Sequence, residues 1–160
     1  MKSLLFGKKK LKVNAVVSGE LIELSHVSDE VFAKKMMGEG YAVEPDDTTI
    51  VAPFDGKIAF VFPTKHAVGL IGESGVEVLI HVGIDTVELK GEGFESLVTE
   101  GQEVKAGQPL LKVDFEGIMQ KGYSKTTMVV VTNSAMFDMN FMKVNGKISA
   151  VDPVLELKLK

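Results

Sequence analysis

The chain has 160 residues, 45% of them hydrophobic and 25% charged, which is the composition of one globular domain. It contains no cysteine, so disulfides, thiolate metal sites and cysteine nucleophiles are excluded. All 18 cationic residues are lysine, and the net charge is −4. Because arginine is absent, the bidentate contacts that recognise phosphate and guanine are missing, and we expect no nucleic-acid binding.

The charge is unevenly distributed along the chain. Residues 1–12 hold five lysines and no acidic residue, which leaves 13 lysines against 22 acidic residues in the remainder. We therefore predict a basic flexible tail over residues 1–14 and a single domain over residues 15–160. Apolar residues among the lysines of the tail suggest a weak contact with anionic membranes. The apolar run at 4–6 is too short for a secretory signal, and no segment reaches the roughly 18 apolar residues of a membrane span, so we expect a cytoplasmic protein.

Short apolar segments separated by turn residues dominate the chain. They are rich in Val, Ile, Leu and Phe and occur at 15–17, 49–51, 57–62, 76–80, 110–113 and 128–131. This pattern predicts an all-β fold, an antiparallel β-sandwich or barrel with short helical segments. The best helical segment runs from Ser28 to Met37, with Ser28 as the N-cap and Gly38 as the stop.

Two of the three histidines are predicted to face each other. Gly72–Gly75 reads as a four-residue turn, and antiparallel pairing across it places His66 directly opposite His81. Opposed side chains have Cβ atoms about 4.5–5.5 Å apart. In this register, Ala67 and Ile80 lie on the core face, and the histidines lie on the opposite face. His26 has no such neighbour and is interpreted as structural.

Two kinds of chemistry suit this pair. The imidazoles could be two ligands of a zinc ion, with Asp85 as a third. Alternatively, one neutral imidazole could be a nucleophile for a phosphoryl group whose oxygens the second imidazole and the Thr64 hydroxyl stabilise. The spacing of the residues leaves both interpretations open.

A longer block around the second histidine is more specific. Residues His81 to Phe94 resemble the active-site signature of the glucose-type IIA domain (EIIA-Glc family) of the bacterial phosphoenolpyruvate-dependent sugar phosphotransferase system. Thr64–Ala67, Ala52–Gly56 and Asp29–Ala33 also match patterns of that family. The similarity extends from about residue 15 to the C-terminus.

The resemblance implies an antiparallel β-sandwich that carries a phosphoryl group. His81 would be the phosphoryl acceptor through Nε2 (tele-phosphohistidine), oriented through its other ring nitrogen by the Gly83 carbonyl, with His66 assisting. The donor would be the histidine-containing phosphocarrier HPr. The acceptor would be a cysteine of the IIB domain of a glucose-type permease, which phosphorylates the sugar during uptake.

The resemblance also implies a docking patch and no obligatory cofactor. The residues expected to bind the protein partners are Asp29, Val31, Phe32, Met36, Met37, Phe62, Leu79 and Val87. Asp29, Glu30 and Asp85 would form an acidic rim, although many relatives have an apolar residue at the position of Glu30. Zinc at His66 and His81 would be adventitious or regulatory.

Two rival classes remain at this point. A zinc hydrolase resembling cell-wall peptidases of related architecture would need a third ligand and a general base. A biotinyl or lipoyl carrier is suggested by the turns at 52–56 and 101–111. Its nearest acceptor is Lys143, within Met142–Gly146, which lacks the second methionine that usually flanks the modified lysine.

Overall fold

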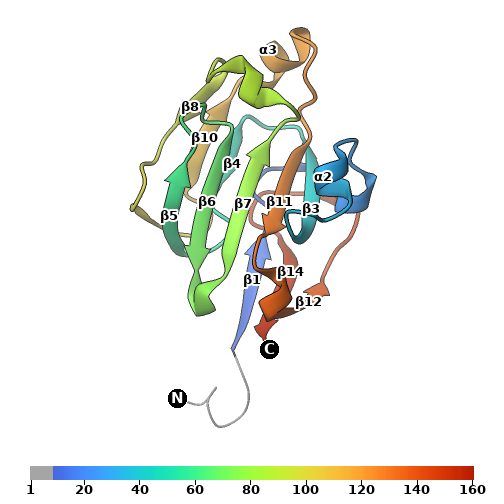
Figure 1. The fold of residues 1–160 in the computed structure, drawn as a ribbon, viewed down its shortest axis with the longest axis vertical. Helices are drawn as coiled ribbons and strands as arrows, with labels where there is room; N and C mark the ends of the chain where they lie inside the picture. The colour runs from blue at the N-terminus through green and yellow to red at the C-terminus, as the bar shows by residue number, and fades with distance from the viewer. Residues whose placement is uncertain (1–8) are drawn as a thin grey trace.

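Three antiparallel sheets form the protein in the computed structural model, which describes residues 9–160 (Figure 1). The largest sheet has eight strands, in the spatial order β13 (Gly146–Ile148), β2 (Gly19–Glu23), β3 (Glu39–Pro45), β11 (Thr127–Val131), β7 (Glu77–Val82), β6 (Ala67–Gly72), β5 (Gly56–Val61) and β9 (Glu103–Val104). The predicted all-β sandwich is confirmed, and no closed barrel forms among the described residues.

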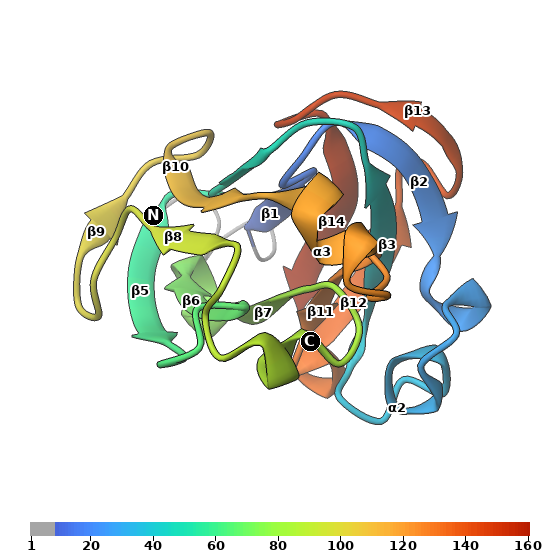
Figure 2. The same ribbon diagram turned by 90° about the horizontal axis from the view of Figure 1, so that it is seen from above.

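Two smaller sheets cover one face of the large sheet (Figure 2). Their strands, in spatial order, are β1 (Lys10–Asn14), β14 (Pro153–Leu159) and β12 (Phe137–Phe141) in one, and β4 (Thr49–Val51), β10 (Pro109–Val113) and β8 (Phe94–Ser96) in the other. The helical segments are η1 (Leu24–His26), α2 (Glu30–Ala33), η2 (Glu73–Gly75), η3 (Thr86–Leu89), α3 (Phe115–Gln120) and η4 (Ser134–Met136). No described helix is long and apolar enough to cross a membrane.

The main core lies between the large sheet and the two small ones. Alternate residues of β7, namely Val78, Ile80 and Val82, are buried in it. The residues between them face the other side of the sheet, where a second, smaller apolar cluster forms under α2 and η1. That outer cluster consists of Leu24, Val27, Phe32, Ala42, Ala67, Leu79, Met128 and Val130. The sheet is therefore buried on both faces near β7 and β11.

The predicted tail is too long at its C-terminal end. Residues 10–14 form β1, which pairs with β14 from Lys10↔Lys158 to Asn14↔Pro153. Leu11 and Val13 alternate with lysines, so the strand buries its apolar side chains and exposes its charges. The structured domain thus begins before residue 15. The rest of the predicted tail, residues 1–8, lies outside the described residues.

The predicted helix at 28–37 is much shorter than expected. Only Glu30–Ala33 is α-helical, and its N-cap is Asp29, whose carboxylate accepts a hydrogen bond from the Val31 amide at 2.9 Å. Ser28 is therefore not the cap. Lys35 adopts the left-handed conformation, with φ of 61°, and this ends the helical path before Met37.

The predicted register between the histidine strands is wrong by one residue. Gly72 donates to the Val76 carbonyl, so the β6–β7 loop has three residues rather than four. Its middle residue, Ser74, has a φ of 59°. The pairs are consequently Ala67↔His81 and Val68↔Ile80. Val68, rather than Ala67, is on the face of the main core, and Ile71 is exposed instead of buried.

Candidate functional site

His81 lies near the end of β7, on the outer face of the large sheet. Its strand neighbours are Ala67 of β6 and Met128 of β11. The ring nitrogen Nδ1 is 2.9 Å from the Gly83 carbonyl oxygen. Since a carbonyl only accepts, Nδ1 carries the proton and Nε2 has the free lone pair. Nε2 is not fully buried, and it has no hydrogen-bond partner within residues 9–160.

His66 lies beside His81, but it comes from the residues just before β6 and not from a strand. It precedes β6, and its carbonyl accepts a 2.7 Å hydrogen bond from the Val82 amide. Lys65, with φ of 60°, turns the chain just before it. This turn brings the His66 ring beside His81 even though Ala67, and not His66, is the cross-strand partner. The ring centroids are 4.9 Å apart and nearly perpendicular, at 82°.

Thr64 orients His66 rather than pointing freely into the site. Its hydroxyl oxygen is 2.8 Å from His66 Nδ1. If the hydroxyl donates, His66 keeps its proton on Nε2, where it could donate to an anion held between the rings. Thr64 therefore has a positioning contact with His66, and its role as a direct phosphoryl donor stays a prediction.

Aromatic rings surround the two imidazoles. Phe32 lies 5.0 Å from the His81 ring, and Phe62 lies 5.3 Å from the His66 ring, centroid to centroid. Burial lowers the pKa of His66 to about 4, with a further contribution from its neighbour His81. Burial also lowers the pKa of His81, although its bond to Gly83 and the charges of Asp29 and Asp85 act in the opposite direction. Both imidazoles are therefore neutral at pH 7.

The predicted docking residues fall into two groups. Val31, Met36, Met37, Phe62 and Val87 are exposed, Met36 to 70%. Phe32 and Leu79, by contrast, are only 6% exposed and belong to the outer cluster, so they are core residues, and a contact with partners stays a prediction for them. The Phe32 ring packs against the His81 ring. We call the five exposed residues the apolar rim.

These two groups predict opposite effects of truncation. Phe32→Ala should destabilise the protein by about 3 kcal/mol or more, because it leaves a cavity in the outer cluster and removes the ring beside His81. Met36→Ala should leave the thermal midpoint nearly unchanged, because its side chain is solvated. Thermal unfolding of both variants tests this. Equal midpoints for the two variants would contradict the assignment of Phe32 to the core.

The pKa values predict a pH-dependent contribution to stability. His66 is neutral in the folded state down to about pH 4, whereas in the unfolded chain it takes up a proton below about pH 6.5. The unfolded state then binds more protons, so stability falls as the pH drops from about 6.5 to 4. His66→Gln should remove part of this slope. Denaturant unfolding of both proteins across this range would show it, and parallel curves would contradict the lowered pKa.

The zinc interpretation finds no third ligand. The residues from 9 to 160 contain no group of three or more His, Asp or Glu side chains spaced to hold a metal ion. Asp85 follows β7 in the left-handed conformation, with φ of 60°, and is exposed. A catalytic zinc centre usually has three protein ligands. The hydrolase alternative therefore lacks the ligand set it needs.

Two other features noted in the sequence lie away from the pair. His26 is exposed at the end of η1. Lys143 is in the loop between β12 and β13, where its Nζ donates to the Lys147 carbonyl. Neither residue has a ring contact with His66 or His81, and nothing in the loop supports a carrier lysine.

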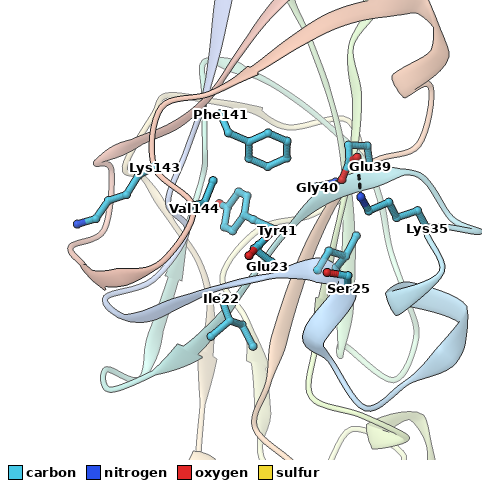
Figure 3. Close-up of a pocket in the computed structure, with 11 residues that line it drawn as sticks. Ile22, Glu23, Ser25, Lys35, Glu39, Gly40, Tyr41, Phe141, Lys143 and Val144 are labelled. Atoms are coloured by element: carbon cyan, nitrogen blue, oxygen red, sulfur yellow. Dashed lines mark hydrogen bonds and ion pairs between the residues drawn. The ribbon is translucent and has the colours of Figure 1, made fainter.

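A small pocket opens on the outer surface near the same loop (Figure 3). An ion pair between Lys35 and Glu39, with 3.0 Å between Nζ and Oε2, lies on one side, and Phe141 on another. Its lining residues are Ile22, Glu23, Leu24, Ser25, Lys35, Glu39, Gly40, Tyr41, Phe141, Lys143 and Val144. No histidine lines it, so the candidate chemistry stays with the His66–His81 pair.

Sequence reasoning missed the residues that hold the backbone after His81. Thr86 donates to the Val82 carbonyl, and the Ser124 and Thr126 carbonyls accept from the Ile84 and Gly83 amides. Thr86 lies within the recognised block at 81–94 and could have been singled out there. Ser124 and Thr126 are about 40 residues away in sequence, and no local pattern indicates their contact.

The fold and the site together define a β-sandwich protein with a pair of neutral histidines, of which His66 is buried and His81 is partly exposed. The model of the family described as phosphoenolpyruvate-dependent sugar phosphotransferase system, EIIA 1, matches residues 11–137. The chain belongs to this family, and it is a component of the sugar phosphotransferase system.

A solved structure agrees with the family assignment. The protein is similar to the glucose permease IIA from Mycoplasma capricolum, with 43% sequence identity and a TM-score of 0.89. The match covers 94% of this chain and 97% of that one. The resemblance inferred from the sequence is thereby confirmed at the level of the family.

Proposed function

We propose that the protein carries a phosphoryl group on His81 Nε2, between HPr and the IIB domain of a glucose-type permease. The observation that supports this most strongly is the hydrogen bond from Nδ1 to the Gly83 carbonyl. It fixes the proton on one nitrogen and leaves the other, solvent-accessible nitrogen as the nucleophile. Family membership supports transfer within the sugar phosphotransferase system.

The chemistry needs no proton transfer at His81. The Nε2 lone pair forms a bond to phosphorus, while the bond between phosphorus and the nitrogen of the donor histidine breaks. The proton stays on Nδ1 and is donated in a hydrogen bond to the Gly83 carbonyl, which stabilises the positive charge that develops on the ring. The same steps in reverse, with a IIB cysteine sulfur as the attacking atom, release the group.

His66 would stabilise the transferred phosphoryl group. Its ring is buried, and its centroid is 4.9 Å from that of the His81 ring. Because its pKa is low, His66 is a neutral donor, and its hydrogen bond to the phosphoryl oxygens is weaker than that of a permanent cation. A reversible carrier needs such moderate stabilisation, because the group must leave again.

The apolar rim and the acidic residues beside it would contact the partners. Val31 on α2 and Met36 after it are exposed, and Asp29 and Asp85 place negative charge near His81. A rim of apolar side chains with nearby charge is typical of a transient protein interface. Transfer between soluble carriers and the permease's inner side would take place in the cytoplasm.

Zinc, if it binds, would use only the two imidazoles. Neutral imidazole nitrogen is a zinc ligand, and both rings are neutral and adjacent. We propose that such binding is adventitious or regulatory, since it would occupy the nitrogen that takes the phosphoryl group. No metal takes part in the transfer steps above.

The experiment that tests the function is reconstitution of phosphoryl transfer. The protein is incubated with phosphoenolpyruvate and the two general phosphotransferase proteins, one of which is HPr. We expect one equivalent of acid-labile, base-stable phosphate on the protein. No incorporation with an active donor system, or incorporation of an acid-stable phosphate, would contradict the proposal.

The basic N-terminal segment carries a separate prediction. We expect deletion of residues 1–8, which spares β1, to abolish binding to vesicles that contain anionic lipid, because it removes the apolar residues that precede β1 and two of the tail's five lysines. Sedimentation with such vesicles measures this, and neutral vesicles are the control. Undiminished binding after the deletion would rule out the tail as the contact.

A further inference from the structure

Two consecutive peptide groups flank the Cα atom of Gly83, and each is held at both ends. In the first, the Val82 carbonyl accepts from the Thr86 hydroxyl at 2.5 Å, and the Gly83 amide donates to the Thr126 carbonyl at 2.9 Å. In the second, the Gly83 carbonyl accepts from His81 Nδ1, and the Ile84 amide donates to the Ser124 carbonyl at 3.2 Å.

The geometry of the peptide bond couples these contacts. In a planar trans peptide, the N–H and the C=O point in opposite directions. Holding the Ile84 amide on the Ser124 carbonyl therefore aims the Gly83 carbonyl away from Ser124 and toward His81. The first peptide group is fixed in the same way, so little rotational freedom remains on either side of Gly83.

Glycine is required at position 83 by both conformation and space. Its φ of +81° is in the region that side chains disfavour. A Cβ atom there would lie 2.4 Å from Thr86 Cγ2 and 2.9 Å from the Ser124 carbonyl oxygen. The Thr86 methyl and the Ser124 backbone thus pack directly against Gly83, in addition to their hydrogen bonds.

Side-chain hydrogen bonds also hold Ser124 and Thr126, whose carbonyls accept from the Ile84 and Gly83 amides. Ser124 Oγ accepts from the Thr126 amide at 3.2 Å and is 2.9 Å from Thr126 Oγ1. Thr126 Oγ1 in turn donates to the Glu44 carboxylate on β3. Thr86 is fully buried, and Thr126 is 6% exposed. The carbonyl oxygens of Ser124 and Thr126 are therefore presented by an ordered segment.

We propose that Thr86 and the segment Ser124–Thr126 are positioning residues for the phosphoryl acceptor. They aim the Gly83 carbonyl at Nδ1 and thereby keep the His81 proton off Nε2. This inference rests on the proposed function of His81. It extends that function to residues that touch neither the histidine ring nor a partner.

The test compares two changes at Thr86. Thr86→Val keeps the shape and loses the hydroxyl, whereas Thr86→Ser keeps the hydroxyl and loses the methyl group. We expect the valine variant to populate both His81 tautomers, seen in the imidazole ¹⁵N shifts of the unphosphorylated protein. Phosphorylation by HPr should slow about 10- to 100-fold, by analogy with the loss of an outer-shell partner that orients a metal-binding histidine. The serine variant should retain the wild-type tautomer.

A matched control separates positioning from stability. Ser96→Ala removes another hydroxyl-to-carbonyl hydrogen bond, of 2.7 Å to Val98, on the distant strand β8. It should leave the His81 tautomer and the rate unchanged even where the midpoint falls. If Thr86→Val does not fold, Ser124→Ala takes its place and should shift the tautomer in the same direction.

The outcomes distinguish this inference from the proposed function. A folded Thr86→Val protein with only the Nδ1–H tautomer and a wild-type rate would overturn the positioning role. If wild-type protein takes up no phosphate, the proposed function fails. The ¹⁵N shifts, measured without any donor, still decide whether Thr86 controls the tautomer.

Discussion

His81→Ala should take up no phosphate from HPr, because it removes the nitrogen that forms the bond to phosphorus. The ring is half-buried between Phe32 and His66, so its loss should cost little of the fold's stability. The measurement is incorporation of radioactive phosphate from labelled phosphoenolpyruvate. A circular dichroism spectrum like that of wild type shows that the variant is folded.

The control for this substitution is His26→Ala. His26 is exposed on η1 and has no contact with the site, so its loss should leave uptake at the wild-type level. Labelling of His81→Ala to the wild-type extent would show that another residue is the acceptor. The histidine pair would then need a different role.

His66→Gln should separate the two half-reactions. The glutamine amide can donate one hydrogen bond to the phosphoryl oxygens, so we expect the variant to accept phosphate from HPr. Onward transfer to the IIB domain should fall about 100- to 1000-fold, since the glutamine amide does not reproduce the preorganised position of the imidazole N–H in the loose transition state. Rapid-quench measurement of each half-reaction, with purified phosphoprotein for the second, gives both rates.

Two other results for His66→Gln would change the account. Wild-type rates in both half-reactions would show that His66 only fills the space beside His81. If His66→Gln took up no phosphate while His81→Ala did, the roles of the two histidines would be reversed. Thr64→Val is a useful companion, because it leaves the His66 ring in place but removes the contact to its Nδ1.

The sequence predicted the sandwich and the proximity of the histidines better than it predicted the details of the sheet. His66 and His81 were expected together because of the turn between them, and their rings are 4.9 Å apart. The predicted strand register was wrong by one residue, since the cross-strand partner of His81 is Ala67 and not His66. One loop residue fewer shifts the register, and only the turn at Lys65 restores the contact.

The alternation of apolar and polar residues along the strands did not reveal that the outer face of the large sheet is also buried. A strand in a sandwich is expected to have one core face and one solvent face, so Leu79 was assigned to the surface. In the structure, α2 and η1 cover that face and bury Leu79 together with Phe32. A four-residue helix is too short for its periodicity to reveal which side packs. The contacts of Ser124 and Thr126 with the Gly83 segment are also non-local, and no sequence spacing encodes them.

The central claim is that the phosphoryl group is bonded to Nε2 of His81. The most direct measurement is a ³¹P–¹⁵N correlation spectrum of the protein phosphorylated with phosphoenolpyruvate, with histidine labelled in the ring. We predict a single phosphorus coupled to Nε2 of His81, while Nδ1 keeps its proton toward Gly83. Coupling to Nδ1 of His81, or to a nitrogen of His66 or His26, would contradict the claim.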